Sequence, residues 1–180
     1  MKCALLPYTD IDGIPTFTDS LIRGLFHRME DEGLVGAVFS DGSVTTADKF
    51  LHLMKFGMNR LFVIDLEGCL AGCVWLNNFE TRKADFHFCF FSNLRGDLAV
   101  EEGKGIVTEL LNMTNESGAP VFDLLVGLVS TLNPAALRWC RRMEFSTLGT
   151  LPSAAYDAKS GGSVPGEVFY VERGEYGKGR

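Results

Sequence analysis

Residues 133–145 read NPAALRWCRRMEF, the pattern of a capped helix that runs directly into a strand. Asn133 is a good N-cap, because its side-chain oxygen can accept a hydrogen bond from a backbone N–H that the first turn leaves unpaired. Pro134 suits the first helical position, where its missing N–H costs nothing. One face then carries Ala136, Cys140 and Met143, and the other carries Arg138, Arg141 and Arg142. The stretch predicts a short amphipathic helix followed by a strand that begins near Phe145.

Length and composition indicate one globular domain. The chain has 180 residues, of which 46% are hydrophobic, and its net charge is −6. We expect a single domain over residues 1–173 and a flexible glycine-containing tail over residues 174–180. The acidic balance excludes a basic nucleic-acid footprint and favours cationic small substrates. No apolar run approaches the ~20 residues of a membrane span, and the start is too short for a signal-peptide core, so we expect a cytoplasmic protein.

The cysteines and histidines give no metal signature. The five cysteines are scattered without a C-x-x-C pair, and the three histidines have no ligand spacing. We therefore expect reduced thiols and no metal site. The sequence does not indicate an oligomeric state.

Hydrophobic periodicity predicts a mixed α+β fold. The expected order is strand, two helices, three antiparallel strands, helix, strand, helix and two strands, with residues 34–39 as an extended apolar stretch. Strands are expected at residues 3–8, 60–65, 69–76, 85–92, 121–129, 145–151 and 167–173, with residues 160–166 as a loop. Helices are expected from Thr18 or Asp19 to Gly33, from Thr45, through residues 106–117, and from Asn133. A six- to seven-stranded mixed sheet with about four helices follows.

This order, together with Asn133, Ala136 and Phe145, resembles the GCN5-related N-acetyltransferase (GNAT) superfamily. Members carry an Asn after the fifth strand, Ala three positions on, often Tyr at seven, and Gly-Phe at eleven and twelve. Here Cys140 and Glu144 stand in place of the Tyr and the Gly. The run from Asn133 to Phe145 also resembles that of small phage-type acetyltransferase-like proteins. A different α+β domain with a six- or seven-stranded mixed sheet is the alternative.

The resemblance implies that acetyl-CoA binds where the strands at 85–92 and 121–129 splay apart. Its pantetheine arm would pair with the first strand, and its diphosphate would lie on N–H groups of a glycine-rich turn. Two registers are open for that turn: Gly103-Lys104-Gly105 before a later helix, or Arg95-Gly96 directly after the strand, with both later glycines inside the helix at a cost of ~1 kcal/mol each. That cost favours the first register. The implied cofactor-binding residues are Phe90, Phe91, Ser92, Arg95, Gly96, Gly103, Lys104, Gly105 and Asn133.

Acetyl transfer to an amine needs a base for the amine proton, a polariser for the carbonyl and a proton for the leaving thiolate. The resemblance implies a polarising backbone N–H near Phe90 or Phe91. Asp85 and His87 share one strand face and are candidate bases, although a solvated Asp at the strand start and a hydrogen-bonded sheet His are the favoured explanation. Cys140 stands at the usual Tyr position as a candidate acid, although packing also explains it. Trp139, Tyr8 and Tyr156 are alternative donors.

The sequence therefore predicts an acetyl-CoA-dependent N-acyltransferase acting on the amine of an unknown small molecule or peptide by direct attack. The alternative is a non-catalytic GNAT-like module that binds CoA or a protein partner. It is favoured by the missing Tyr, the missing Gln or Arg before the glycines, and the neighbouring pair Glu101-Glu102.

Overall fold

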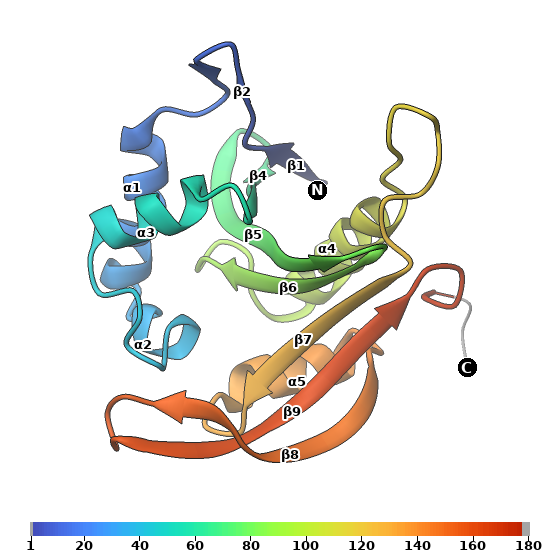
Figure 1. Cartoon of the computed structure of the whole chain (residues 1–180). Coiled ribbons are helices and arrows are strands. Elements are labelled where there is room, and N and C mark those ends of the chain that lie inside the picture. The colour runs from blue at the N-terminus through green and yellow to red at the C-terminus, as the bar shows by residue number, and fades with distance from the viewer. Residues whose placement is uncertain (1, 178–180) are drawn as a thin grey trace.

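A computed structural model describes residues 2–177 and shows the predicted mixed α+β fold (Figure 1). Residues 178–180 of the expected tail lie outside the described residues. Seven strands form one sheet in the order β1-β4-β5-β6-β7-β9-β8. Their bounds are β1 Cys3–Pro7, β4 Arg60–Leu66, β5 Cys69–Glu80, β6 Lys83–Phe90, β7 Leu124–Ser130, β8 Ser146–Asp157 and β9 Gly162–Glu172. A separate small hairpin joins β2 Asp10–Ile11 to β3 Ile14–Pro15.

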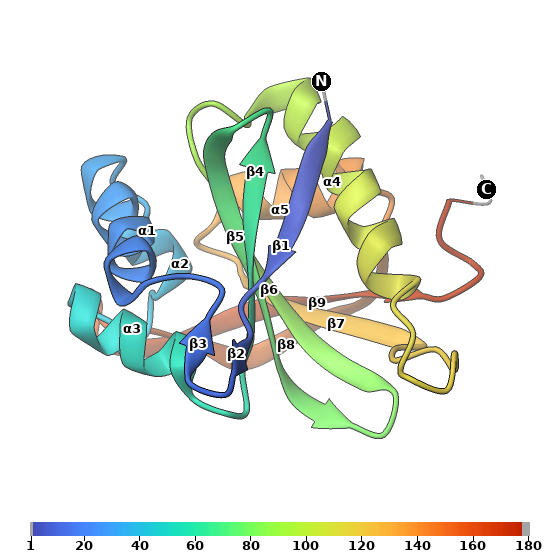
Figure 2. The ribbon, with the colours of Figure 1, turned by 90° about the horizontal axis from the view of Figure 1, so that it is seen from above.

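Helices cover both faces of the sheet (Figure 2). One face carries α1 Asp19–Asp31, α2 Val35–Val38 and α3 Ala47–Lys55, and the other carries α4 Gly96–Leu111 and α5 Pro134–Arg142. Each face has its own hydrophobic core, because the β4 and β5 side chains alternate between the two sides. Among the described residues no helix is long and apolar enough to span a membrane, and no group of His, Cys, Asp or Glu could hold a metal ion.

Side-chain caps begin α1, α3 and α5 where the sequence predicts them, with one shift, and α2 and α4 begin without one. The Asn133 side-chain oxygen accepts a hydrogen bond from the Ala136 N–H at 3.1 Å, and Pro134 occupies the first turn, so the predicted cap is confirmed. Thr18 caps α1 by accepting from the Leu21 N–H at 3.2 Å. The α3 cap is Thr46, one residue after the predicted Thr45.

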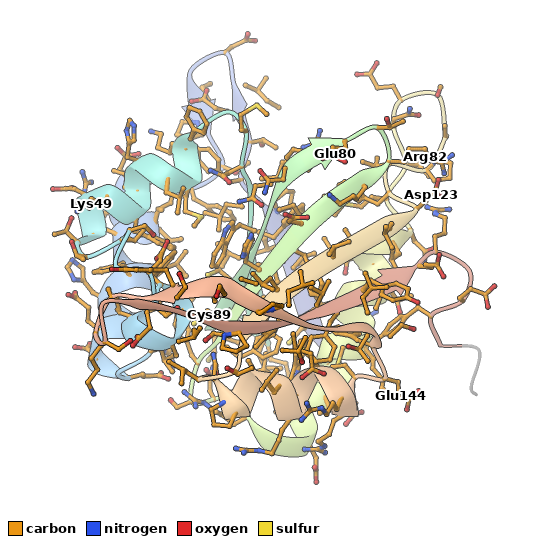
Figure 3. All side chains as sticks on the ribbon, turned by 60° about the horizontal axis from the view of Figure 1, so that its bottom comes forward. Lys49, Glu80, Arg82, Cys89, Asp123 and Glu144 are labelled. Atoms are coloured by element: carbon orange, nitrogen blue, oxygen red, sulfur yellow. The ribbon has the colours of Figure 1, made fainter. Side chains whose placement is uncertain are left out.

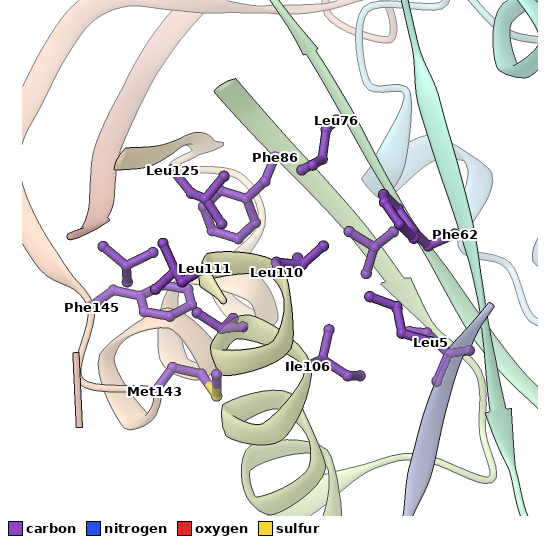
Figure 4. Close-up of a cluster of buried hydrophobic side chains, with 14 of the residues drawn as sticks. Leu5, Phe62, Leu76, Phe86, Ile106, Leu110, Leu111, Leu125, Met143 and Phe145 are labelled. Carbon is purple, nitrogen blue, oxygen red and sulfur yellow. The ribbon is translucent and has the colours of Figure 1, made fainter. Parts of the chain in front are cut away.

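The core beneath α4 fixes this helix against the sheet and against α5. Figure 4 shows Ile106, Leu110 and Leu111 facing strand residues such as Phe86 and Leu125. All five side chains are buried. The close contact of α4 with the sheet sets the position of its N-terminus, which opens beside the end of β6.

Three predicted elements differ in the structure. Residues 34–39 contain the helix α2, because a short apolar run does not separate strand from helix. Helix α4 ends at Leu111, since the Asn115 side chain accepts from the Ser117 and Ala119 N–H groups and forms a turn. Most of the loop predicted at 160–166 belongs to β9, whose Gly166 packs under Leu128. Residues 174–177 form turns, with the Tyr176 ring on Phe145.

Candidate active site

Strands β6 and β7 are joined at one end only. Their parallel pairing runs from Lys83↔Leu124 to Asp85↔Val126 and stops there. An ion pair of 2.5 Å between Arg82 and Asp123 closes this end, and Figure 3 shows the two side chains together there, away from Cys89. Farther along, the two ribbons diverge (Figure 1). The predicted splayed gap in the sheet is confirmed.

A cavity of about 550 Å³ occupies this gap. Its walls are β6, β7, the start of α4, one face of α5, and α2 with its flanking residues. The predicted site residues that line it are His87, Phe90, Arg95, Gly96, Asn133 and Cys140. The predicted residues outside its lining are Asp85, Phe91, Ser92, Gly103, Lys104 and Gly105.

The main chain of β6 offers an open strand edge to the cavity. The Phe91 N–H donates to the Ala71 carbonyl at 2.8 Å, on the side of β5. Main-chain groups of successive residues point to opposite edges of a strand, so those of Phe90 face the gap. Phe90 lies beyond the last residue of β6 that pairs with β7. The edge is therefore free to pair with an extended chain, as a neighbouring strand would.

His87 lies in the cavity wall in a fixed orientation. Its ring stacks on Trp75 with 4.8 Å between centroids and 7° between planes. Its Nε2 lies 3.1 Å from the Asn77 side-chain oxygen. An amide oxygen only accepts, so with the amide in this orientation Nε2 carries the proton and Nδ1 keeps its lone pair. Burial lowers the pKa of His87 from 6.5, against the opposing charge of Asp85, so the ring is neutral at pH 7.

Asp85 and Cys140, the other two candidate catalytic residues, differ in their access to the cavity. Asp85 lies at the joined end of the gap, where it accepts from the Asn78 side-chain amide at 2.9 Å and pairs with Lys83 at 3.5 Å. Cys140 lines the cavity but is almost fully buried, and burial raises its pKa to about 12. Of the alternative donors, Trp139 lines the cavity and Tyr8 and Tyr156 do not.

The N-terminus of α4 opens at one end of the cavity. Arg95 is the residue before the helix, and Gly96 has φ +64°, a conformation that favours glycine. The Arg95 guanidinium donates to Glu32 at 3.0 Å, which ties this turn to α1. Arg142 of α5 forms an ion pair with Asp97 in the first turn. Arg95, Arg142 and Arg138 all line the cavity, and the first two are each paired with a carboxylate, Glu32 and Asp97.

No family model and no curated protein matches the sequence. Solved structures do match. RimL, the ribosomal L7/L12 alpha-N-protein acetyltransferase in complex with coenzyme A, aligns over 95% of this chain and 94% of that chain with TM-score 0.69 and 14% identity. Spermidine N-acetyltransferase from Vibrio cholerae, in complex with CoA and spermine, aligns over 97% and 98% with TM-score 0.68 and 15% identity. The chain has the GNAT fold.

A third GNAT neighbour is the microcin C7 self immunity acetyltransferase MccE in complex with acetyl-CoA and AMP. It aligns over 86% of both chains with TM-score 0.64 and 15% identity. At these identities the likeness establishes the fold alone.

The turn that follows β6 contains Arg95 and Gly96, and α4 begins directly after the strand. Gly103 and Gly105 lie inside α4, so the placement of Gly103-Lys104-Gly105 in a loop before the helix is wrong. Gly103 is needed for packing, since a Cβ there would lie 2.8 Å from the Trp139 ring. Lys104 pairs with Glu144 at 2.8 Å. Tertiary packing against α5 therefore outweighs the helix-propensity cost that favoured the other register.

Glu102, Ser92 and Phe91 also lie outside the cavity lining. The Glu102 carboxylate lies in the core and accepts from the Cys3 N–H at 2.6 Å, away from the cavity. Ser92 donates to Glu32 at 3.0 Å, and Phe91 is buried in the core on the α1 side of the sheet. These two predicted cofactor-binding residues therefore support the turn from outside the cavity.

Sequence reasoning missed the residues that orient the site. Trp75 is the direct partner of His87 across β5 and β6, and Asn77 lies two residues along the same strand. Their roles depend on the register between β5 and β6, which the turn at Thr81-Arg82 sets and which no pattern within β6 reveals. The α2 wall had no detectable signal, because its residues are small and apolar.

Proposed function

We propose that this chain is an acetyl-CoA-dependent N-acyltransferase, with residues 1–173 as its one domain. The observation that carries the proposal is the cavity of about 550 Å³ between β6 and β7, with an open strand edge on one side and a helix N-terminus at one end. An extended amide-containing arm can pair with that edge. The helix N-terminus and the nearby arginines favour an anion. Acetyl-CoA has both parts, a pantetheine arm and a diphosphate.

The charged end of the cavity fits the diphosphate. The first turn of α4 leaves N–H groups that the helix itself cannot pair. Arg95 and Arg142 line the same end, and Asn133 lies at the start of α5 on the opposite wall. Acetyl-CoA supplies the activated acetyl thioester when bound.

On this proposal the Phe90 N–H polarises the thioester carbonyl. Phe91 is unsuited to this role, because its N–H is already paired across β5. His87 Nδ1 accepts the amine proton, and the amine nitrogen forms a bond to the acetyl carbon while the carbon–sulfur bond breaks. Asp85 acts on His87 through its charge alone, since it lies outside the cavity wall.

Cys140 is a poor proton donor for the leaving thiolate. Its pKa of about 12 lies well above the ordinary thiol value of ~8.5. Transfer of its proton to a leaving thiolate of ordinary pKa would therefore be uphill by roughly 4–5 kcal/mol. A thiol in this wall can instead donate a weak hydrogen bond to the sulfur. We therefore expect Cys140→Ser to keep most of the turnover, with the thiolate protonated by solvent.

The alternative, a non-catalytic module that binds CoA or a protein partner, is favoured by one observation. Asp97 places a carboxylate in the first turn of α4 and is paired with Arg142. A bound diphosphate would have to compete with that carboxylate for the arginine. The cytoplasmic location predicted from the sequence stays a prediction.

The test is calorimetry with acetyl-CoA, followed by thiol release with a panel of amines. We expect acetyl-CoA to bind and His87→Gln to lose at least tenfold in turnover with near wild-type acetyl-CoA affinity. Asp85→Asn is the matched control and should change turnover less, because Asp85 does not line the cavity. Absence of acetyl-CoA binding by the folded wild type would refute the proposal, and binding without transfer to any amine would support the module.

A further inference from the structure

The cavity wall formed by α2 and its flanking residues is apolar and held in place. Helix α2 and its flanks contribute Leu34, Ala37 and Val38 to the wall. The Asn133 side-chain amide donates to the Ala37 carbonyl at 3.3 Å and so joins α2 to the start of α5 across the gap. The Ala158 N–H donates to the Ser40 carbonyl at 2.7 Å and joins the β8–β9 hairpin to the same segment. This wall therefore has a defined shape and few polar groups.

The cavity has no negative charge in its wall. Within residues 2–177, no Asp or Glu lines it, although the whole chain has net charge −6. Its charged lining residues are Arg95, Arg138 and Arg142. The nearby acids are already engaged, because Asp85 pairs with Lys83 and Glu32 pairs with Arg95. Burying an unpaired positive charge here would be costly.

An aromatic stack leads to the same wall. Phe39 stacks on Trp75 with 5.7 Å between centroids, and Trp75 stacks on His87 with 4.8 Å. Trp75 covers one face of the His87 ring, and His87 lines the cavity. An aromatic group in the cavity can therefore contact the His87 ring that this stack holds in place.

We propose that the acceptor is an arylalkyl monoamine, with one amino group on an apolar aromatic body, and that polyamines are excluded. This inference rests on the proposed function, because it names the acceptor of the same site. The single amine enters in its neutral form, with its first proton left in solvent, and His87 Nδ1 takes a proton only as the N–C bond forms, whereas each further ammonium group of a polyamine would also have to lose its proton or stay in a wall that offers it no carboxylate.

Amine binding to the wild-type chain without acetyl-CoA tests this directly. The probes are 2-phenylethylamine, its 4-aminomethyl derivative, which adds one ammonium group to the same body, and spermidine, all followed by saturation-transfer NMR and calorimetry. We expect 2-phenylethylamine to bind at least tenfold more tightly than the other two. Equal or tighter binding of the derivative or of spermidine would overturn the proposal, as would no measurable binding of 2-phenylethylamine.

A charge placed in the wall provides a second test. Ala37→Asp should shift the preference at least tenfold toward the 4-aminomethyl derivative, compared with the uncharged control Ala37→Asn. An unchanged preference in a folded Asp variant would show that this wall does not contact the amine. The acetyl-CoA calorimetry is independent of both experiments. A chain that binds acetyl-CoA and acetylates spermidine keeps the proposed function and loses this acceptor class.

Discussion

Two glycines in α4 should respond in opposite directions to the same substitution. A Cβ at Gly103 would lie 2.8 Å from Trp139 Cζ2 and 3.1 Å from Met143 Sδ, whereas a Cβ at Gly105 would meet nothing within 4 Å. Alanine in a helix interior is favoured over glycine by about 1 kcal/mol. Overpacking of a core costs about 1–3 kcal/mol. Gly105→Ala should therefore stabilise by about 1 kcal/mol, and Gly103→Ala should destabilise by up to about 2 kcal/mol.

Urea unfolding of the two variants and the wild type measures this difference. We expect the free energies of unfolding of the variants to differ by about 1–3 kcal/mol, or roughly 2–12 °C in Tm for a chain of this size. Acetyl-CoA calorimetry is the control, and Gly105→Ala should leave the affinity unchanged. Equal destabilisation by both substitutions, or loss of acetyl-CoA binding in Gly105→Ala, would refute the mid-helix assignment and return these glycines to a phosphate-binding turn.

Three further substitutions test the site. Burial of neutral His87 gives stability that is present above the unfolded-state pKa of ~6.5 and is lost as the pH falls through the lower folded-state pKa. In urea titrations at several pH values, the unfolding free energy of the wild type should therefore fall relative to that of His87→Gln below pH ~6.5. A parallel pH dependence of the two proteins would contradict this. Asp97→Asn should release Arg142 and tighten acetyl-CoA binding several-fold by calorimetry, and weaker binding would contradict the assignment of this end to the diphosphate. Asn133→Ala should cost about 0.5–2 kcal/mol of stability through the lost cap. Asn133→Asp keeps the cap, loses only the bond to the Ala37 carbonyl and should cost less, and equal losses in both would count against capping.

The sequence was sufficient to predict an element where the local signals agree with the fold. Asn133 and Pro134 predict the start of α5, and Glu67-Gly68 predicts the β4–β5 hairpin, because caps and tight turns depend on residues close in the chain. The long apolar run after residue 121 predicts a central strand, and β7 lies between β6 and β9.

The sequence was insufficient to predict an element or a side-chain orientation where contacts between residues far apart in the chain determine it. Gly103 and Gly105 look like a loop until Trp139 of α5 is placed against the first of them. The α2 residues look like a strand until the contact between Asn133 and Ala37 joins that segment to the other side of the gap. The orientation of His87 depends on Trp75 and Asn77 of a neighbouring strand, so a pattern within β6 alone could not show it.

The central claim is that the space between β6 and β7 holds acetyl-CoA along the main chain of β6. Titration of the ¹⁵N-labelled protein with acetyl-CoA, followed by amide chemical shifts, tests this most directly. The account predicts the largest shifts at Phe88 and Phe90 on β6 and at Gly96 at the start of α4, with small shifts at Gly105. Shifts confined to another surface, or none at millimolar acetyl-CoA, would contradict it.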